Sequence, residues 1–346
     1  MDNQNYLQWL LSNTKTTWWH DSADPKELSF GIKHGASGVT TNPVLVNTTL
    51  ITNQRYWSNK MNKYLSSDQS TQERAEALMK IVVIDIAEKL IPEFERSGGH
   101  SGFVCAQIDP SLAGERESMI SMIERFHSWA PNIAVKLPVT AAGLDALEMC
   151  ISRGITVTAT VSFTVPQVIA IAERHRKGIL RAKKNGKKPG NCFAVIMIGR
   201  LDDYLRDCAK DSGAAIEEDD IRKAGLAVTK KAYSIYKDLG YQAKLIVAAL
   251  RGTYHLTELA GADLIMSIHP KYQYQFLSPD IPFEQRIAEQ LDPSVFRRLS
   301  KLPEFVRAYE PSGMMPEEFI TFGATQRTLS QFSEIGWKQL TRFNTK

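Results

Sequence analysis

The chain has 346 residues, of which 43% are hydrophobic and 23% charged, a composition typical of soluble globular proteins. Its formal net charge of +4 is small for this length and argues against nucleic-acid binding. The N-terminal residues lack the basic and apolar regions of a signal peptide, and no apolar run reaches the length of a membrane span. We therefore expect a cytoplasmic protein with neither nucleic-acid nor membrane partners.

Strand-like and helix-like segments alternate along the chain after a short amphipathic segment at residues 6–11. Strands are expected at residues 16–21, 38–43, 102–108, 133–137, 155–161, 192–198, 243–250 and 263–268. Helices are expected at residues 24–34, 71–91, 112–129, 141–152, 165–180, 202–239 and 254–259. Eight alternating units predict an α/β protein, a closed (β/α)8 TIM barrel of parallel strands.

The domain organisation follows from the absence of a linker or a shift in composition. We expect one domain over residues 1–346, with a barrel core at about residues 16–280 and a helical extension at about residues 281–346. A dinucleotide-binding sheet is disfavoured because no G-x-G-x-x-G motif follows the first strand.

The cysteines could form disulfides or bind zinc, and one basic run could form a binding patch. The four cysteines are Cys105, Cys150, Cys192 and Cys208. They have neither C-x-x-C spacing nor paired histidines, so reduced core cysteines are favoured over disulfides or zinc ligands. The basic run at residues 181–188 contains no aromatic residue and ends at Pro189-Gly190. This pattern favours a solvated loop over a binding patch.

Lys136 interrupts the apolar strand at residues 133–137. One interpretation places it at an edge, where its long side chain reaches water. The other buries the amine, so that desolvation lowers its pKa and makes it a nucleophile able to form a Schiff base.

Other polar side chains stand at or near the predicted strand ends, where barrel enzymes have their active sites. They are Asp21, Asn42, Gln107, Asp109, Thr158, Thr160, Arg200 and Arg251. Each alone could be a helix cap or an ion-pair partner. Together with a lysine they favour Schiff-base chemistry on a sugar: a carboxylate to move protons, amides to hold hydroxyls and guanidiniums to bind an anion.

Several motifs in this order resemble those of the transaldolase family. They are Asp21-Ser-Ala, Gly38-Val-Thr-Thr-Asn-Pro43, Val135-Lys-Leu-Pro-Val-Thr-Ala-Ala-Gly-Leu144, Gly154-Ile-Thr-Val-Thr-Ala-Thr-Val-Ser-Phe-Thr164, Gly199-Arg-Leu-Asp202, Leu250-Arg251 and Glu258-Leu-Ala-Gly-Ala-Asp263. The tail at residues 319–340 is similar to the C-terminal helix that closes over the family's site. The resemblance covers almost the whole chain.

The resemblance implies a role for each matching residue in the reaction. Lys136 would attack the ketose carbonyl and form the Schiff base. Asp21 would take the proton from the C4 hydroxyl as the C3–C4 bond breaks, and Thr160 would help to position the catalytic water. No cofactor and no metal are implied, because the protonated imine is itself the electron sink.

The resemblance also implies the residues that bind substrate. Asn42, with Thr41 and Thr158, would hold the dihydroxyacetone unit. Arg200 and Arg251 would bind the terminal phosphate of a small sugar phosphate. This role places the chain in carbohydrate metabolism, in the pentose phosphate pathway. The sequence leaves the oligomeric state open, a homo-oligomer included.

Some positions depart from the family pattern. Gln107 stands where the family has a glutamate that works with the water, and an amide cannot accept a proton. Glutamine there resembles the fructose-6-phosphate aldolase branch, which has a tyrosine where this chain has Met197. Thr158 replaces the usual asparagine. Val195 and Ala249 replace two serines that accompany the phosphate-binding arginines.

These features leave three hypotheses. The leading one is a transaldolase that moves dihydroxyacetone from an anionic ketose, such as fructose 6-phosphate or the sulfonate 6-deoxy-6-sulfofructose, to an aldose acceptor. Gln107 motivates an aldolase that releases free dihydroxyacetone. The missing acid and serines motivate a non-catalytic barrel that binds a sugar phosphate.

Overall fold

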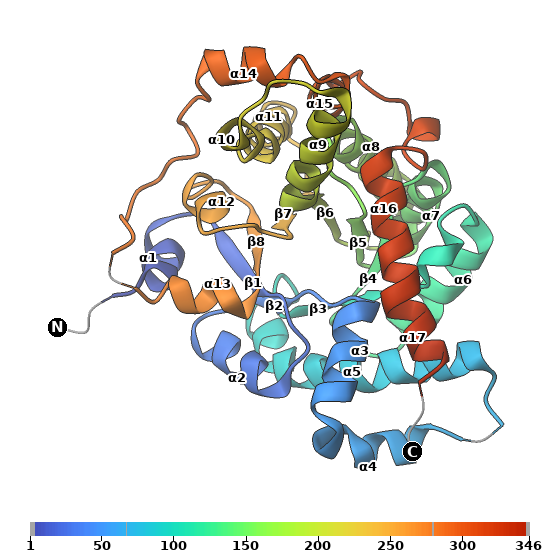
Figure 1. Ribbon diagram of the computed structural model, residues 1–346. Coiled ribbons are helices and arrows are strands. Elements are labelled where there is room, and N and C mark those ends of the chain that lie inside the picture. Colours follow the sequence, from blue (N-terminus) through green and yellow to red (C-terminus); the bar gives the residue numbers. More distant parts are fainter. Residues whose placement is uncertain (1–3, 67, 279, 344–346) are drawn as a thin grey trace.

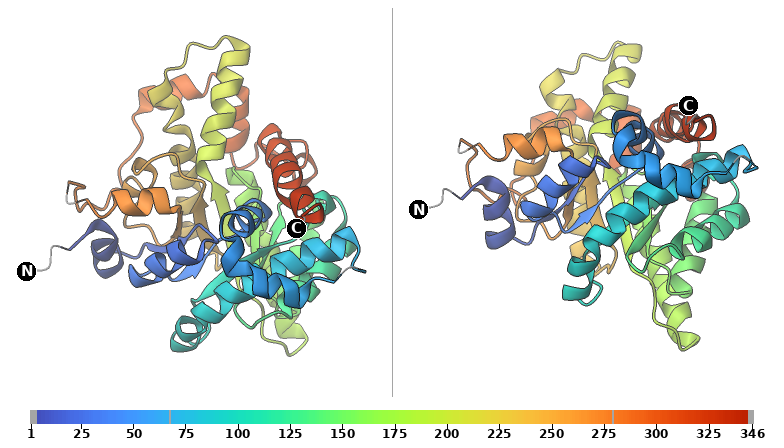
Figure 2. Two further views of the ribbon diagram at one scale, coloured as in Figure 1. Left: turned by 60° about the horizontal axis from the view of Figure 1, so that its bottom comes forward. Right: turned by 90° about the horizontal axis from the view of Figure 1, so that it is seen from below.

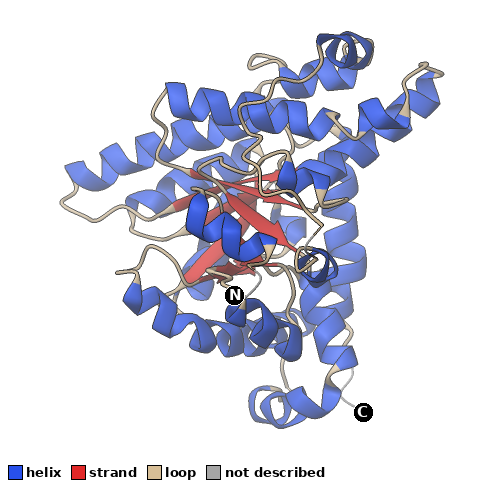
Figure 3. Ribbon diagram, turned by 90° about the vertical axis from the view of Figure 1, so that its left-hand side faces the viewer, coloured by secondary structure: helices blue, strands red, loops and turns tan. Residues whose placement is uncertain are grey.

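The strands of this computed structural model, which describes residues 4–66, 68–278 and 280–343, form a closed barrel in which each pairs in parallel with the next. The strands are β1 (Thr17–His20), β2 (Gly38–Val39), β3 (Phe103–Gln107), β4 (Ile133–Pro138), β5 (Val157–Thr160), β6 (Cys192–Met197), β7 (Lys244–Ala248) and β8 (Ile265–Ile268). Figure 3 shows these strands at the centre of a shell of helices. The predicted (β/α)8 barrel is confirmed.

The helices cover the outside of the barrel and extend beyond it (Figure 1). In the first half of the chain they are α1 (Tyr6–Asn13), α2 (Pro25–Lys33), α3 (Pro43–Thr52), α4 (Gln54–Tyr64), α5 (Thr71–Arg96), the short η1 (Pro110–Leu112), α6 (Arg116–His127), α7 (Ala141–Ser152) and α8 (Val165–Lys184). In the second half they are α9 (Ile198–Ser212), α10 (Glu218–Ile221), α11 (Ala224–Asp238), α12 (Tyr254–Thr257), α13 (Pro270–Gln275), α14 (Pro293–Leu299), α15 (Pro303–Tyr309), the short η2 (Pro316–Glu318), α16 (Gly323–Phe332), the π-helical η3 (Ser333–Trp337) and α17 (Lys338–Thr341).

Three predicted features differ from the structure. The helix expected at residues 202–239 is divided, because Gly213 takes a left-handed φ of 66° and ends α9. Arg200 does not end strand six, since β6 stops at Met197 and Arg200 lies in the first turn of α9. The basic run at residues 181–188 is a loop only in part, because its first residues form the last turn of α8. Positive side chains there interact favourably with the negative end of the helix dipole.

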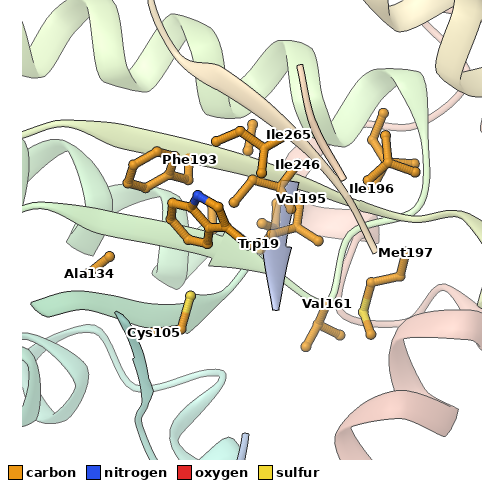
Figure 4. Close-up of a cluster of buried hydrophobic side chains, with 14 of the residues drawn as sticks. Trp19, Cys105, Ala134, Val161, Phe193, Val195, Ile196, Met197, Ile246 and Ile265 are labelled. Carbon is orange, nitrogen blue, oxygen red and sulfur yellow. The ribbon is translucent and has the colours of Figure 1, made fainter. Parts of the chain in front are cut away.

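The barrel interior changes character from one end to the other. Figure 4 shows Trp19, Cys105, Ala134 and Phe193 among the buried side chains, and the Trp19 and Phe193 rings lie 4.8 Å apart. Because strand side chains alternate between faces, residues two positions further on point into the same interior. An apolar floor therefore lies beneath the polar carboxyl ends of the strands. All four cysteines are free, as expected.

The C-terminal extension packs back onto the barrel. Figure 2 shows the red α16–α17 segment beside the barrel, and its two ends dock through glycines at which a side chain would collide. A Cβ atom on Gly323 would lie 2.5 Å from the Tyr204 ring, and one on Gly336 would lie 2.9 Å from Pro43. The second contact brings η3 against the start of α3, which follows Asn42. Among the described residues, none of the helices has the length and apolarity needed to cross a bilayer.

Candidate active site

The strand register brings the predicted catalytic residues to one end of the barrel. Gln107 on β3 pairs in register with Lys136 on β4, and Lys136 pairs with Thr158 on β5. Asp21 immediately follows β1, and its backbone N–H donates to the Ile268 carbonyl of β8. Residues paired in register on parallel strands face the same side of a sheet. These side chains therefore face the barrel interior near its carboxyl end.

Lys136 is buried, with 6% of its surface exposed, so the edge interpretation is wrong. Its Nζ donates a hydrogen bond of 3.2 Å to the Thr41 carbonyl. Burial lowers the pKa of the amine below the usual lysine value, Asp21 opposes this shift and the Arg200 guanidinium adds to it. A lowered pKa increases the fraction of neutral amine, which is the form that attacks a carbonyl.

Asp21 is held in place by a chain of hydroxyl groups. Thr40 Oγ1 donates to Asp21 Oδ1 at 2.7 Å and lies 2.6 Å from Ser267 Oγ. A hydroxyl has a single proton, so Ser267 is the donor to Thr40 when Thr40 donates to the carboxylate. Thr40 and Ser267 are buried, whereas Asp21 is partly exposed. The chain orients one carboxylate oxygen, while the other has no hydrogen-bond partner among the described residues and is available for proton transfer.

Asn42 and Thr41 lie where β2 leads into α3. Asn42 caps the helix, because its Oδ1 accepts from the N–H groups of Val44 and Leu45 at 2.9 and 3.1 Å. Thr41 Oγ1 donates to the Cys105 carbonyl at 2.6 Å. The Asn42 side chain therefore caps α3, and the Thr41 side chain links β2 to β3. The Thr41 backbone carbonyl is the group that contacts Lys136.

Gln107 is the last residue of β3 and Asp109 lies two residues beyond it, but the two side chains have different surroundings. Gln107 is buried, and its Oε1 has no hydrogen-bond partner among the described residues. An unpaired buried acceptor is costly, which is typical of a group placed for a ligand or a water molecule. Asp109 instead caps η1 through Ser111 and accepts from Gln72 at 2.9 Å. The structure removes Asp109 from the set of polar residues expected at the site.

The two β5 threonines are both buried. Thr158 accepts a 3.5 Å contact from the Cys105 thiol, while Thr160 Oγ1 lies 4.0 Å from the Met197 sulfur. The next residue, Val161, has a φ of +56°, an uncommon conformation for a β-branched residue. Ala249, at the end of β7, has a φ of +59°. Strained backbone therefore follows two strands at this end of the barrel.

Arg200 and Arg251 lie beyond the strand ends and line one cavity together with Asp203. Arg251 donates to Asp203 Oδ2 through Nε and Nη2 at 3.0 and 2.6 Å, and to the Ala249 carbonyl through Nη1 at 2.8 Å. Burial lowers the pKa of Arg200 to about 10, with a further lowering by Arg251, so Arg200 is charged at neutral pH. Although burial opposes it, hydrogen bonds from Arg251 and Arg206 lower the pKa of Asp203.

A buried histidine supports the backbone of Arg251. His255 Nδ1 accepts from the Arg251 N–H at 3.2 Å, so its other ring nitrogen carries the proton and donates to Asp202 at 3.0 Å. Asp202 Oδ1 also accepts from the Gly225 N–H at 2.8 Å. His255 and Asp202 are completely buried. This network joins α9, α11 and the segment after β7 beneath the arginine pair.

The C-terminal helix adds residues that the sequence analysis did not identify individually. The Phe332 ring centroid lies 5.9 Å from Lys136 Nζ and 5.1 Å from the Arg200 guanidinium carbon. Gln331 Oε1 accepts from Arg200 Nη1. Phe332 thus stands between the buried amine and the arginines. The expectation that residues 319–340 close over the site identified the segment, but not these side chains.

The chain is similar to known proteins over most of its length. Residues 18–312 match the family model described as Transaldolase/Fructose-6-phosphate aldolase. The chain belongs to this family. A transaldolase of Thiobacillus denitrificans is 29% identical over 70% of this chain and 67% of its own length. Transaldolases of Kocuria rhizophila and Neisseria gonorrhoeae are 25% and 27% identical, over 66% and 60% of this chain and 64% and 58% of their own lengths.

Two positions that depart from the family pattern, Val195 and Ala249, have different surroundings in the structure. Val195 lies among the buried apolar side chains of the barrel (Figure 4). Ala249 contributes its carbonyl, not a hydroxyl, to Arg251. The resemblance implied a serine hydroxyl at each of these two positions, and neither side chain here can donate a hydrogen bond. Within the part of the chain that is described, no group of three or more histidine, cysteine or acidic side chains could hold a metal ion.

Proposed function

We propose that the protein is a transaldolase that transfers a dihydroxyacetone unit from an anionic ketose to an aldose acceptor through a Schiff base on Lys136. The observation that carries this proposal is the buried Lys136 amine, with its lowered pKa, at the polar end of the barrel. Such an amine is costly to bury and is suited to attack a ketone carbonyl. The relatives named transaldolase support the same reaction class.

In the proposed reaction, neutral Lys136 adds to the C2 carbonyl to give a carbinolamine. Its hydroxyl then takes up a proton relayed from solvent by the ordered water and leaves as water, which gives a protonated imine. Asp21 accepts the proton of the C4 hydroxyl while the C3–C4 bond breaks. The electron pair of that bond flows into the imine, which leaves an enamine on Lys136 and releases the aldehyde fragment. The enamine then attacks the acceptor aldehyde, and the steps reverse. Thr160 and Gln107 would orient the water that forms and later hydrolyses the imine.

Substrate binding in this proposal divides along the site. Asn42, Thr41 and Thr158 lie on the side of the dihydroxyacetone unit, near Lys136. Arg200 and Arg251 would bind the terminal anion, a phosphate as in fructose 6-phosphate or a sulfonate as in 6-deoxy-6-sulfofructose. Arginine forks suit both groups.

Borohydride trapping tests the proposal directly. With fructose 6-phosphate and borohydride, we expect irreversible inactivation and a stable mass increase on the peptide that contains Lys136. Lys136→Met should abolish the labelling, whereas Lys89→Met should not, because Lys89 pairs with Asp85 on α5. Absence of an adduct with ketose phosphates, the sulfonate and dihydroxyacetone would refute the Schiff-base reaction and favour the non-catalytic barrel.

The second candidate is an aldolase that releases free dihydroxyacetone. The unpartnered Gln107 Oε1 favours it, because an amide cannot take the proton that the family's glutamate accepts. Product analysis with and without an aldehyde acceptor separates the two reactions. Transfer predicts little free dihydroxyacetone when the acceptor is omitted, whereas steady release without acceptor would support the aldolase.

A further inference from the structure

A cavity of about 390 Å³ lies beside the arginine pair, where the barrel meets the C-terminal helix. Its lining residues are Arg200, Asp203, Arg251, Ala324, Arg327, Thr328 and Gln331. The last four of these belong to α16. Their spacing of three, four and seven residues places them on one face of that helix. The cavity is therefore shared between the barrel and a segment that follows it in the chain.

The barrel arginines alone offer few free donors to a ligand. Arg251 already uses Nε, Nη2 and Nη1 in hydrogen bonds to Asp203 and to a backbone carbonyl. Ala249, whose carbonyl accepts from Arg251, has no side-chain hydroxyl to offer a ligand there. Arg200 Nη1 donates to the side-chain Oε1 of Gln331, and within the described part of the chain the two amide hydrogens of Gln331 have no acceptor.

Arg327 is a third guanidinium on the cavity wall. It pairs with Asp207 at 2.7 Å, with about half of each side chain exposed. Exposed pairs of this kind are weak and exchange readily, so Arg327 can turn toward a ligand at little cost. The cavity lining then carries three guanidiniums against one carboxylate, that of Asp203. This balance of charge favours a dianion over a monoanion.

We propose that α16 completes the terminal-anion site, with Arg327 and Gln331 acting as specificity-determining residues that select a phosphate dianion over a sulfonate monoanion. The proposal rests on the transaldolase function proposed above. Gln331 positions Arg200 and donates its amide hydrogens, while Arg327 supplies the additional charge. The helix thereby replaces the donors that the two missing serines do not provide.

The test compares donors that differ only at their terminal group. For Arg327→Met and Gln331→Glu we expect the KM for fructose 6-phosphate to rise about 10-fold, with kcat within twofold of wild type and the KM for fructose unchanged. The wild type should have a lower KM for fructose 6-phosphate than for 6-deoxy-6-sulfofructose, and Arg327→Met should narrow that difference. Arg125→Met is the matched control, because Arg125 is also about half exposed and paired, at 2.8 Å to Glu76, but lies on α6. Arg125→Met should leave the KM for fructose 6-phosphate and the KM for fructose unchanged.

Two outcomes overturn the inference. One is a KM for fructose 6-phosphate within twofold of wild type in both variants, and the other is a KM for fructose that rises equally. A Tm within 2 °C of wild type, with Arg327→Lys as a milder variant, guards against a folding defect. Trapping with dihydroxyacetone separates this inference from the proposed function, because that ketone carries no anion. Labelled Lys136 with an unaltered phosphate KM would refute only the role of α16, whereas unlabelled Lys136 would refute the Schiff base itself.

Discussion

The two ends of the site are built differently. The reaction end consists of Asp21, Gln107 and Lys136, which lie at strand ends and are held by the strand register. The anion end consists of side chains on a helix, a loop and the C-terminal segment, and Arg251 is 37% exposed. Strands in a closed barrel cannot shift independently, whereas docked helices can. In the proposed reaction, the rigid part of the site is the part where bonds would change, and the adaptable part is the one that would bind the anion.

This difference predicts that changes at the reaction end alter kcat and changes at the anion end alter KM. The largest effect is expected for Lys136→Met, which should reduce activity to background because Lys136 is the one buried lysine among the described residues. The same variant should be more stable than the wild type, since it removes a buried amine. We expect a Tm increase of roughly 2 °C or more at neutral pH, measured by calorimetry.

The pH dependence of that stability difference follows from the lowered pKa of Lys136. Between the folded-state pKa and the ordinary lysine value, the unfolded chain binds more protons than the folded protein. Wild-type stability therefore rises with pH through this window. The advantage of Lys136→Met should shrink as the pH approaches the ordinary lysine pKa. An advantage that does not change with pH would mean that the amine is not desolvated.

The second largest effect is expected for Asp21→Asn. An amide accepts the Thr40 hydrogen bond but cannot take a proton from the C4 hydroxyl, so kcat should fall by about 10²- to 10⁴-fold with little change in KM. Asp109→Asn is the matched control, because Asp109 also follows a strand, β3, but its carboxylate caps η1 and accepts from Gln72. Steady-state kinetics should show normal kcat for that control. An equal loss in both variants would point to general damage at the strand ends.

At the anion end, Arg251→Lys should raise the KM for a phosphorylated donor. A lysine cannot form the fork that Arg251 makes with Asp203 or extend paired donors to an anion. The expected increase is about 10-fold, with kcat and trapping by dihydroxyacetone retained. Arg206→Lys serves as the control, because Arg206 pairs with Asp203 but does not line the cavity. A fall in kcat as large as the rise in KM would contradict the division between the two ends.

The reaction end could be predicted from the sequence because it depends on local periodicity. Alternating strands and helices predict a barrel, and the carboxyl ends of its strands are known in advance to hold the site. Lys136 and Asp21 follow from that rule, and so does Gln107. The same rule wrongly included Asp109, because it cannot tell a ligand-facing side chain from a cap on the next turn.

The anion end could be predicted only in part. The resemblance identified Arg200 and Arg251, but Gln331 lies 131 residues from the arginine that it contacts. Its position depends on how α16 docks, and close contacts at Gly323 and Gly336 fix that docking. No periodicity in the chain encodes such a contact. The break of the long helix at Gly213 had a local signal, since a left-handed glycine commonly ends a helix.

The smallest expected effect concerns Gln107 and would sharpen the description of the reaction end. Gln107→Glu places a carboxylate opposite its register partner Lys136, which favours the charged amine and raises the pKa of Lys136. Attack requires the neutral amine, so the rise of trapping rate with pH should move to higher pH by the same amount. At pH 7 imine formation should slow by up to about 10-fold and recover at alkaline pH. Gln107→Met removes the amide without adding charge and should leave the midpoint of the trapping rate against pH unchanged. A shift of that midpoint in both variants would mean that it results from loss of the amide and not from the added charge.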